Sequence, residues 1–246
     1  MDTLSTQKKP ILTVPEKDPP LVAEDITYPG ATGDIRAHFA RPKCNARLPG
    51  IIVIHENRGL VPHIREVARR VALEGFLAIA PDALSPLGGT PEDSEQGRLL
   101  MQKLDSEETT KNFVAAVKYL KTHPQSTGKV GCTGFCWGGG VANQVAVNSP
   151  DVQAVAPFYG RQPAPDEVPK IKASILLHYA GIDERINQGI PAYEAALKQA
   201  SIDYRIHIYE GAEHAFFNDT TPRYHAEAAK LAWERTIAFF KQKLKT

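Results

Sequence analysis

The stretch Lys129–Gly140, KVGCTGFCWGGG, decides how this chain folds. Its first half is typical of a buried strand, and its glycine-rich second half leads into residues 141–148, which favour a helix. Residues 134–138 follow the nucleophile-elbow pattern G-x-S-x-G, with Cys136 in the serine position. A strand that turns so sharply into a helix presents its central side chain above the edge of a sheet.

The position of Cys136 suits a thiol nucleophile. The N-terminus of the following helix stabilises negative charge, which favours both a thiolate and an oxyanion formed later. The backbone N–H of Trp137 is then one expected oxyanion donor. The alternative is a buried structural cysteine in a glycine-rich turn, and the strand–turn–helix setting favours the nucleophile. Cys132 lies inside the strand as a small core residue, and Cys44 lies in a loop.

An elbow of this kind requires an acid and a histidine later in the chain, in that order. Asp183 follows the predicted strand 175–179, and His214 follows the predicted strand 204–209. Both are therefore expected on loops at the edge of the sheet where the elbow opens. The neighbouring Glu184 is the alternative acid.

A second polar cluster, His55-Glu56-Asn57-Arg58-Gly59, follows the apolar run 50–54. In an elbow-containing fold this loop supplies a second oxyanion N–H, here from Asn57. The cluster is not a zinc motif, because H-E-x-x-H would require histidine where Gly59 stands. Glu56 is either a solvated loop acid or a site residue.

Strand and helix signals alternate along the rest of the chain. This alternation predicts an α/β fold with a mostly parallel sheet, helices on both faces and the site beyond the carboxyl ends of the strands. Predicted strands cover residues 34–39, 50–54, 76–80, 129–133, 152–159, 175–179 and 204–209, and predicted helices cover 62–74, 91–104, 107–122, 141–148, 191–200 and 224–243.

Composition excludes several functional classes. The chain has 246 residues, of which 42% are hydrophobic, with 29 Lys+Arg against 28 Asp+Glu. This size and balance predict one globular domain, 25–246, after a proline-rich arm, 1–24, without the basic charge that nucleic acid or an anionic membrane attracts. Three cysteines without C-x-x-C suit a reducing, cytoplasmic location. No phosphate-loop, dinucleotide or metal motif is present, so no cofactor is expected.

In the cysteine, acid, histidine and glutamate described above, the chain resembles the dienelactone hydrolase family. The matching segments are 55–56, 80–82, 134–139, Asp183 and 211–216. The resemblance implies an α/β-hydrolase fold and a catalytic triad of Cys136, His214 and Asp183. It also implies that Glu56 contacts the resting thiol and that substrate displaces this glutamate, which then helps to form the thiolate.

The sequence departs from the family pattern where arginines hold a substrate carboxylate. One such position is Asn218, and the loop 83–88 contains no arginine. Arg58 and Arg161 are the substitutes to consider. The aromatic pair Phe216-Phe217 follows His214, and we expect one of its rings to face the pocket. These departures favour a neutral substrate.

The sequence therefore predicts a hydrolase that cleaves a small-molecule carboxylic ester or lactone through a thioester intermediate. An acyltransferase with the same cysteine, histidine and aspartate is one alternative. A non-catalytic binding module on a hydrolase fold is another. The pattern specifies no oligomeric state.

Overall fold

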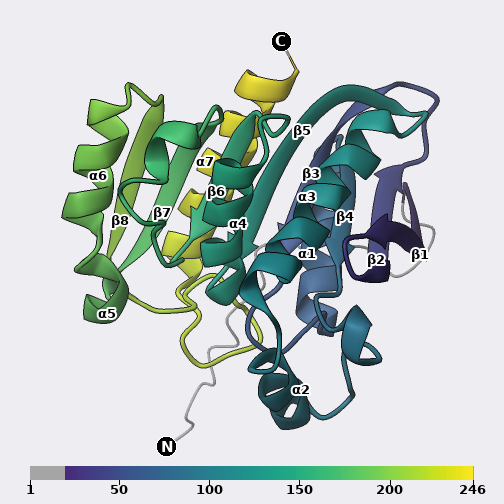
Figure 1. Cartoon of the computed structure of the whole chain (residues 1–246), viewed down its shortest axis with the longest axis horizontal. Helices are drawn as coiled ribbons and strands as arrows, with labels where there is room; N and C mark the ends of the chain where they lie inside the picture. The colour runs from purple at the N-terminus through teal and green to yellow at the C-terminus, as the bar shows by residue number, and fades with distance from the viewer. Residues whose placement is uncertain (1–19, 246) are drawn as a thin grey trace, which may run out of the picture.

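The computed structural model describes residues 20–245 and centres on one eight-stranded sheet (Figure 1). The strand order is β1-β2-β4-β3-β5-β6-β7-β8. β1 pairs antiparallel with β2 and β2 antiparallel with β4, whereas all other neighbours are parallel. The strands are β1 (Leu21–Gly30), β2 (Gly33–Pro42), β3 (Leu48–Ile54), β4 (Leu77–Pro81), β5 (Ser126–Phe135), β6 (Ala154–Phe158), β7 (Ser174–Ile182) and β8 (Tyr204–Glu213).

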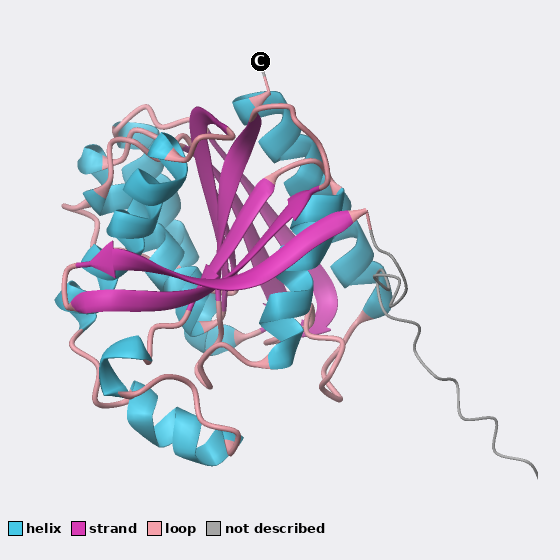
Figure 2. Ribbon diagram, turned by 90° about the vertical axis from the view of Figure 1, so that its right-hand side faces the viewer, coloured by secondary structure: helices cyan, strands magenta, loops and turns pink. Residues whose placement is uncertain are grey.

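Helices cover both faces of the twisted sheet, as Figure 2 shows. They are α1 (Pro62–Leu73), α2 (Ser94–Met101), α3 (Ser106–Thr122), α4 (Trp137–Asn148), α5 (Glu184–Asn187), α6 (Ile190–Gln199) and α7 (Ala226–Leu244), with short 3-10 turns at Ser85–Leu87 and Val168–Lys170. Within residues 20–245, none of the helices has the length and apolar character needed to cross a membrane.

The central strand β3 explains why a sheet covered on both faces forms here. Ile51 and Val53 belong to the core under α1 and α7, whereas Ile52 and Ile54 belong to the core under α3, α4 and α6. All four side chains are fully buried. A continuously apolar strand is required wherever both faces are covered, which is why this segment shows no polar alternation.

The α/β fold and the predicted strands and helices are confirmed, while β1 and the short α5 are elements that the sequence analysis did not predict. Residues 21–24, assigned to the arm, instead begin β1, while residues 1–19 of the predicted arm lie outside the described residues. β1 is an edge strand whose exposed acids, including Glu24 and Asp25, hide the strand pattern. Helix α4 begins at Trp137 rather than near 141, because close packing overrides the low helix propensity of its three glycines.

Loops at the carboxyl ends of the parallel strands meet at one edge of the sheet, at the bottom of Figure 1. One of them, residues 82–90, is organised by the buried Asp82 carboxylate. It accepts hydrogen bonds from the Leu84 N–H at 3.0 Å and from the Thr90 N–H and hydroxyl at 2.7 Å each. The Thr90 hydroxyl oxygen in turn accepts from the Leu60 N–H at 2.7 Å. Two loops at this edge are thereby held together.

Candidate active site

The turn between β5 and α4 has the geometry of a strained elbow. Cys136 has φ 57° and ψ −115°, outside the regions that an L residue ordinarily adopts. Its backbone N–H donates to the Phe158 carbonyl at 3.1 Å, which ties the turn to the end of β6. Such strain persists where surrounding structure enforces it, and it is concentrated at functional sites. The thiol therefore projects from the carboxyl edge of the sheet at the start of α4.

Two glycines allow this turn because other backbone passes where a side chain would lie. A Cβ on Gly134 would sit 2.1 Å from the Gly138 carbonyl oxygen. A Cβ on Gly138 would sit 2.3 Å from the His55 carbonyl oxygen. Neither backbone neighbour can move without displacing a strand or a helix. The pattern G-x-C-x-G is thus a packing requirement.

The acid and the histidine meet at the same edge. Asp183 Oδ2 lies 2.5 Å from His214 Nδ1, and the two side chains are 6% and 16% exposed. Asp183 directly follows β7 and precedes α5, and His214 directly follows β8. The alternative acid, Glu184, is exposed at the start of α5. In this hydrogen bond the Nδ1–H of His214 donates to the Asp183 carboxylate. The other ring nitrogen, Nε2, is then the one that can take up a proton.

The Cys136 thiol is in a resting, protonated state. Burial and the negative charge of Glu56 raise its pKa to about 11, even though the Trp137 N–H acts in the opposite direction. Among the described residues, its sulfur makes no hydrogen bond to His214 or Glu56. A neutral thiol is a weak nucleophile and resists oxidation, so the site requires an activating change before it reacts.

The loop after β3 is held by the buried His55. Its Nδ1–H donates to the Glu56 carbonyl at 2.7 Å, and its Nε2 accepts from the Ala83 N–H at 3.1 Å. Burial lowers the pKa of His55, which agrees with this neutral tautomer. The ring stacks on Trp137 with centroids 5.4 Å apart. His55 therefore fixes the backbone from which Glu56 extends.

The two residues whose backbone N–H groups the sequence analysis expects as oxyanion donors are Trp137 and Asn57. Trp137 is the first residue of α4, where an N–H has no partner within the helix. The Asn57 N–H has no hydrogen-bond partner among the described residues. Trp137 opens α4 after β5, and Asn57 lies in the loop after β3, so both are at the carboxyl edge of the sheet.

Three residues predicted to bind substrate have other partners. Arg58 donates to the Ser94 hydroxyl at 2.7 Å and pairs with Glu95 at 3.1 Å on α2. Phe216 and Phe217 are both fully buried in the aromatic core, where Phe217 stacks on Phe135 at 4.9 Å. The structure thus assigns neither aromatic ring to an exposed pocket wall, because both are needed to fill the space under the loop.

Other residues near the thiol were not expected from the sequence. The positive charges of Arg185 and Arg223 act to lower the pKa of Cys136, although both side chains are exposed. Tyr159 has φ 37°, and its fully buried hydroxyl has no hydrogen-bond partner in the described chain. Its ring lies 5.0 Å from the His214 ring. No sequence motif marks these positions, since each reaches the site through tertiary packing.

Asn218 has an unexpected partner, because its side-chain N–H donates to Glu56 Oε2 at 2.6 Å. Its number places it four residues after His214, the position that the family pattern reserves for an arginine.

The described residues contain no group of three or more His, Cys, Asp or Glu side chains placed to hold a metal ion.

Comparison with known proteins places this geometry in a family. The sequence profile of the dienelactone hydrolase family matches residues 35–244. A "Putative carboxymethylenebutenolidase" of Saccharolobus solfataricus is 34% identical over 257 residues, covering 89% of this chain and 98% of that protein. A protein of the same name from Escherichia coli strain K12 is 33% identical over 242 residues, covering 92% and 89%.

A solved structure agrees with these sequence matches. The crystal structure titled "Putative Dienelactone Hydrolase" from Klebsiella pneumoniae superposes with a TM-score of 0.81 at 28% identity, covering 90% of this chain and 99% of that one. The family profile therefore spans the parallel strands β3 to β8 and the loops at their carboxyl edge. The chain belongs to the dienelactone hydrolase family, a family of α/β-hydrolases that act on ester and lactone bonds.

Proposed function

We propose that this protein hydrolyses carboxylic esters or lactones through a covalent thioester on Cys136, with His214 as the general base and Asp183 as its orienting acid. The observation that supports this most directly is the 2.5 Å hydrogen bond between Asp183 and His214 at the sheet edge where the elbow opens. The strained backbone of Cys136 supports it independently.

The reaction begins when a substrate carbonyl oxygen accepts hydrogen bonds from the Trp137 and Asn57 N–H groups. Cys136 turns toward His214 and transfers its proton to Nε2, and the thiolate attacks the carbonyl carbon. As the tetrahedral intermediate collapses, the ester C–O bond breaks and the leaving alkoxide takes the proton from His214. Asp183 stabilises the imidazolium between these two transfers.

A water molecule then completes the cycle. His214 takes a proton from the water while the water oxygen attacks the thioester carbon. The same backbone amides stabilise the second oxyanion. The C–S bond breaks, the sulfur recovers its proton from His214, and the carboxylic acid leaves. In the resting state Glu56 keeps the thiol neutral, and its displacement by substrate lowers this barrier to thiolate formation.

The surroundings of the thiol favour a neutral acyl group. Asn218 is uncharged and its amide is engaged by Glu56, while the Arg58 guanidinium is paired with Glu95. Neither position therefore offers an open cationic group to a substrate carboxylate. Burying an unpaired carboxylate beside Glu56 would cost several kcal/mol, whereas apolar acyl area gains about 25 cal/mol per Å². Side-by-side kcat/KM values for a neutral short-chain ester and a carboxylate-bearing dienelactone test this. A preference for the dienelactone contradicts it and directs attention to Arg185 and Arg223.

The activity itself is tested with a p-nitrophenyl ester before and after alkylation by iodoacetamide. A Cys44→Ser background removes the other partly exposed thiol, while Cys132 is buried. Hydrolysis that falls in proportion to Cys136 alkylation supports the proposal. Hydrolysis that survives complete alkylation contradicts it. Turnover only with an added alcohol or amine acceptor identifies an acyltransferase, and no turnover on any ester identifies a binding module.

A further inference from the structure

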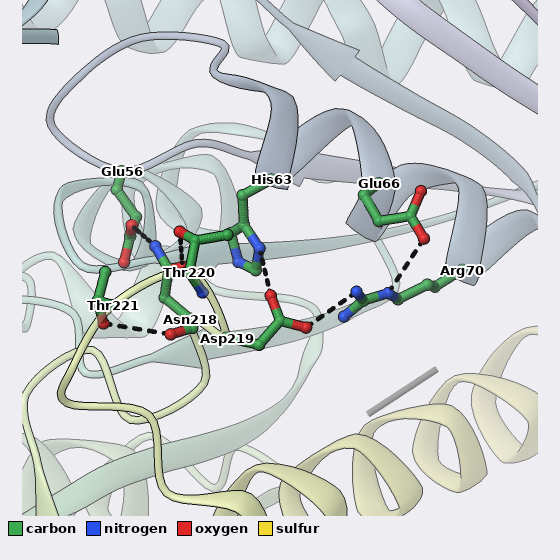
Figure 3. A network of polar contacts seen from close by, with 8 residues as sticks. All are labelled: Glu56, His63, Glu66, Arg70, Asn218, Asp219, Thr220 and Thr221. Carbon is green, nitrogen blue, oxygen red and sulfur yellow. Dashed lines mark hydrogen bonds and ion pairs between the residues drawn. The ribbon is translucent and has the colours of Figure 1, made fainter. Parts of the chain in front are cut away.

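Asn218 is buried and lies at the centre of a polar network that reaches Glu56 (Figure 3). Its side-chain N–H donates to the Glu56 carboxylate at 2.6 Å. Its side-chain oxygen accepts from the Thr220 N–H at 3.0 Å and from the Thr220 hydroxyl at 2.6 Å. These bonds fix which end of the amide points to Glu56, because only the nitrogen can donate to a carboxylate.

The neighbouring Asp219 anchors this segment to helix α1. Its carboxylate lies 3.1 Å from His63 Nδ1 and 2.9 Å from Arg70 Nη2, and all three side chains are at most 7% exposed. Burial would raise the pKa of Asp219, but the hydrogen bond from His63 and the charge of Arg70 outweigh it and leave the pKa lowered. Glu66 adds a contact to Arg70 Nε at 3.5 Å. The backbone next to Asn218 is therefore anchored to α1 through Asp219.

Among the residues that the structure describes, Asn218 alone holds the Glu56 carboxylate in place. Within the described residues, the hydrogen bond from Asn218 is the single hydrogen bond of its carboxylate. The side chain is only partly buried, so a carboxylate without this bond would turn toward solvent. The side-chain N–H of Asn218 thus determines where the negative charge of Glu56 lies.

We propose that Asn218 is a positioning residue that holds the Glu56 carboxylate beside the elbow, with Asp219 anchoring the Asn218 backbone to α1. The consequence for Cys136 rests on the function proposed above, in which this thiol is the nucleophile. Asn218 then sets the resting reactivity of the thiol through Glu56. It acts without touching the sulfur, and it is unavailable for a substrate carboxylate.

Charged groups on several elements act on the pKa of the Cys136 thiol. Glu56 on the loop after β3 opposes thiolate formation, whereas Arg185 on α5 and Arg223 before α7 favour it. The Tyr159 phenol on the β6 side is neutral, because burial and the charge of Glu56 raise its pKa. Moving Glu56 away therefore leaves the two arginines in place and lowers the pH at which the thiol ionises.

The test measures alkylation of Cys136 by iodoacetamide against pH in the Cys44→Ser background, with the modified residue identified by mass spectrometry. Asn218→Ala is expected to lower the pH midpoint and to raise the alkylation rate at pH 8 about three- to tenfold, since each unit of pKa changes the thiolate fraction tenfold. An unchanged midpoint would overturn the proposal.

A double-mutant cycle distinguishes positioning from a structural effect. Glu56→Gln removes the charge and is expected to lower the midpoint at least as far as Asn218→Ala does. Adding Asn218→Ala to Glu56→Gln is then expected to change nothing further, because no charge remains to be positioned. A second, additive fall would show that Asn218 acts on the thiol by another route and would contradict the proposal.

Thr221→Val is the matched control. It removes the 3.2 Å hydrogen bond from the Thr221 hydroxyl to the Asn218 carbonyl in the same loop, and leaves the side-chain amide in place. The midpoint is expected to stay at its original value. If this variant shifts the midpoint as far as Asn218→Ala does, general loosening of the loop explains the effect. Alkylation requires no turnover, so these outcomes hold even if ester hydrolysis fails its own test.

Discussion

The elbow, residues 134–140, and the loop after β8, residues 214–224, meet at the same edge of the sheet but are held in different ways. The elbow is held by backbone approaching backbone, with Gly134 and Gly138 lying where any side chain would collide. The loop is held by side chains that reach distant helices and loops, such as Asn218 to Glu56 and Asp219 to α1. Backbone constraints leave a local mark in the sequence, whereas long-range polar contacts leave none.

The largest expected effect lies in the elbow. Cys136→Ala removes the proposed nucleophile, and we expect kcat/KM for a p-nitrophenyl ester to fall at least about 10⁴-fold. The fold should survive, because alanine tolerates the same φ about as well as cysteine does. The measurement is steady-state kinetics with a thermal melt as its control. Residual activity within tenfold of the original would show that chemistry does not pass through this sulfur.

The acid in the adjoining β7 loop should matter slightly less. Asp183→Asn is expected to lower kcat/KM about 10³-fold, because an amide no longer holds His214 in the tautomer that accepts a proton at Nε2. Glu184→Gln is the matched control, since Glu184 is the next residue and is exposed. Its kcat/KM should stay within about twofold. Equal losses in the two variants would show that the 2.5 Å hydrogen bond is not what selects the acid.

A third prediction tests the backbone side of the comparison. Gly138→Ala should destabilise the fold by more than about 3 kcal/mol, because its Cβ would lie 2.3 Å from the His55 carbonyl oxygen. Gly140→Ala should be neutral or slightly stabilising, since its Cβ meets nothing closer than 3.5 Å and alanine is the better helix former. Urea unfolding of both variants measures the difference. Similar stabilities would refute the packing argument for the elbow.

The smallest expected effect concerns Tyr159, between the two regions. Tyr159→Phe removes a buried hydroxyl that has no hydrogen-bond partner among residues 20–245, so we expect a gain of up to about 1 kcal/mol, or a Tm about 2–4 °C higher. If the hydroxyl donates to bound substrate, kcat/KM should fall about three- to tenfold at the same time. Tyr193→Phe is the control, because its hydroxyl already donates to Asn143 at 3.2 Å and its loss should destabilise. A Tyr159→Phe variant with lower Tm would contradict the argument.

Much of the fold could be predicted from local pattern. The apolar run in β3, the glycine that ends α1 and the order of cysteine, acid and histidine are all visible in the sequence. Each reflects a constraint that acts over a few residues. β1 was missed because an edge strand with exposed acids lacks the apolar alternation that marks a strand, and its pairing with β2 exists only once the chain has folded back.

The candidate site divides in the same way. The sequence by itself determined the elbow around Cys136 and placed Asp183 and His214 on loops at strand ends, because strand direction brings those ends to one edge. Only the tertiary structure decided the partners of side chains on those loops: Arg58 pairs with Glu95, and Asn218 holds Glu56. Asn218 and Glu56 are 162 positions apart in the chain. A hydrogen bond of 2.6 Å across that separation depends on the packing of every element between them, which no local pattern records.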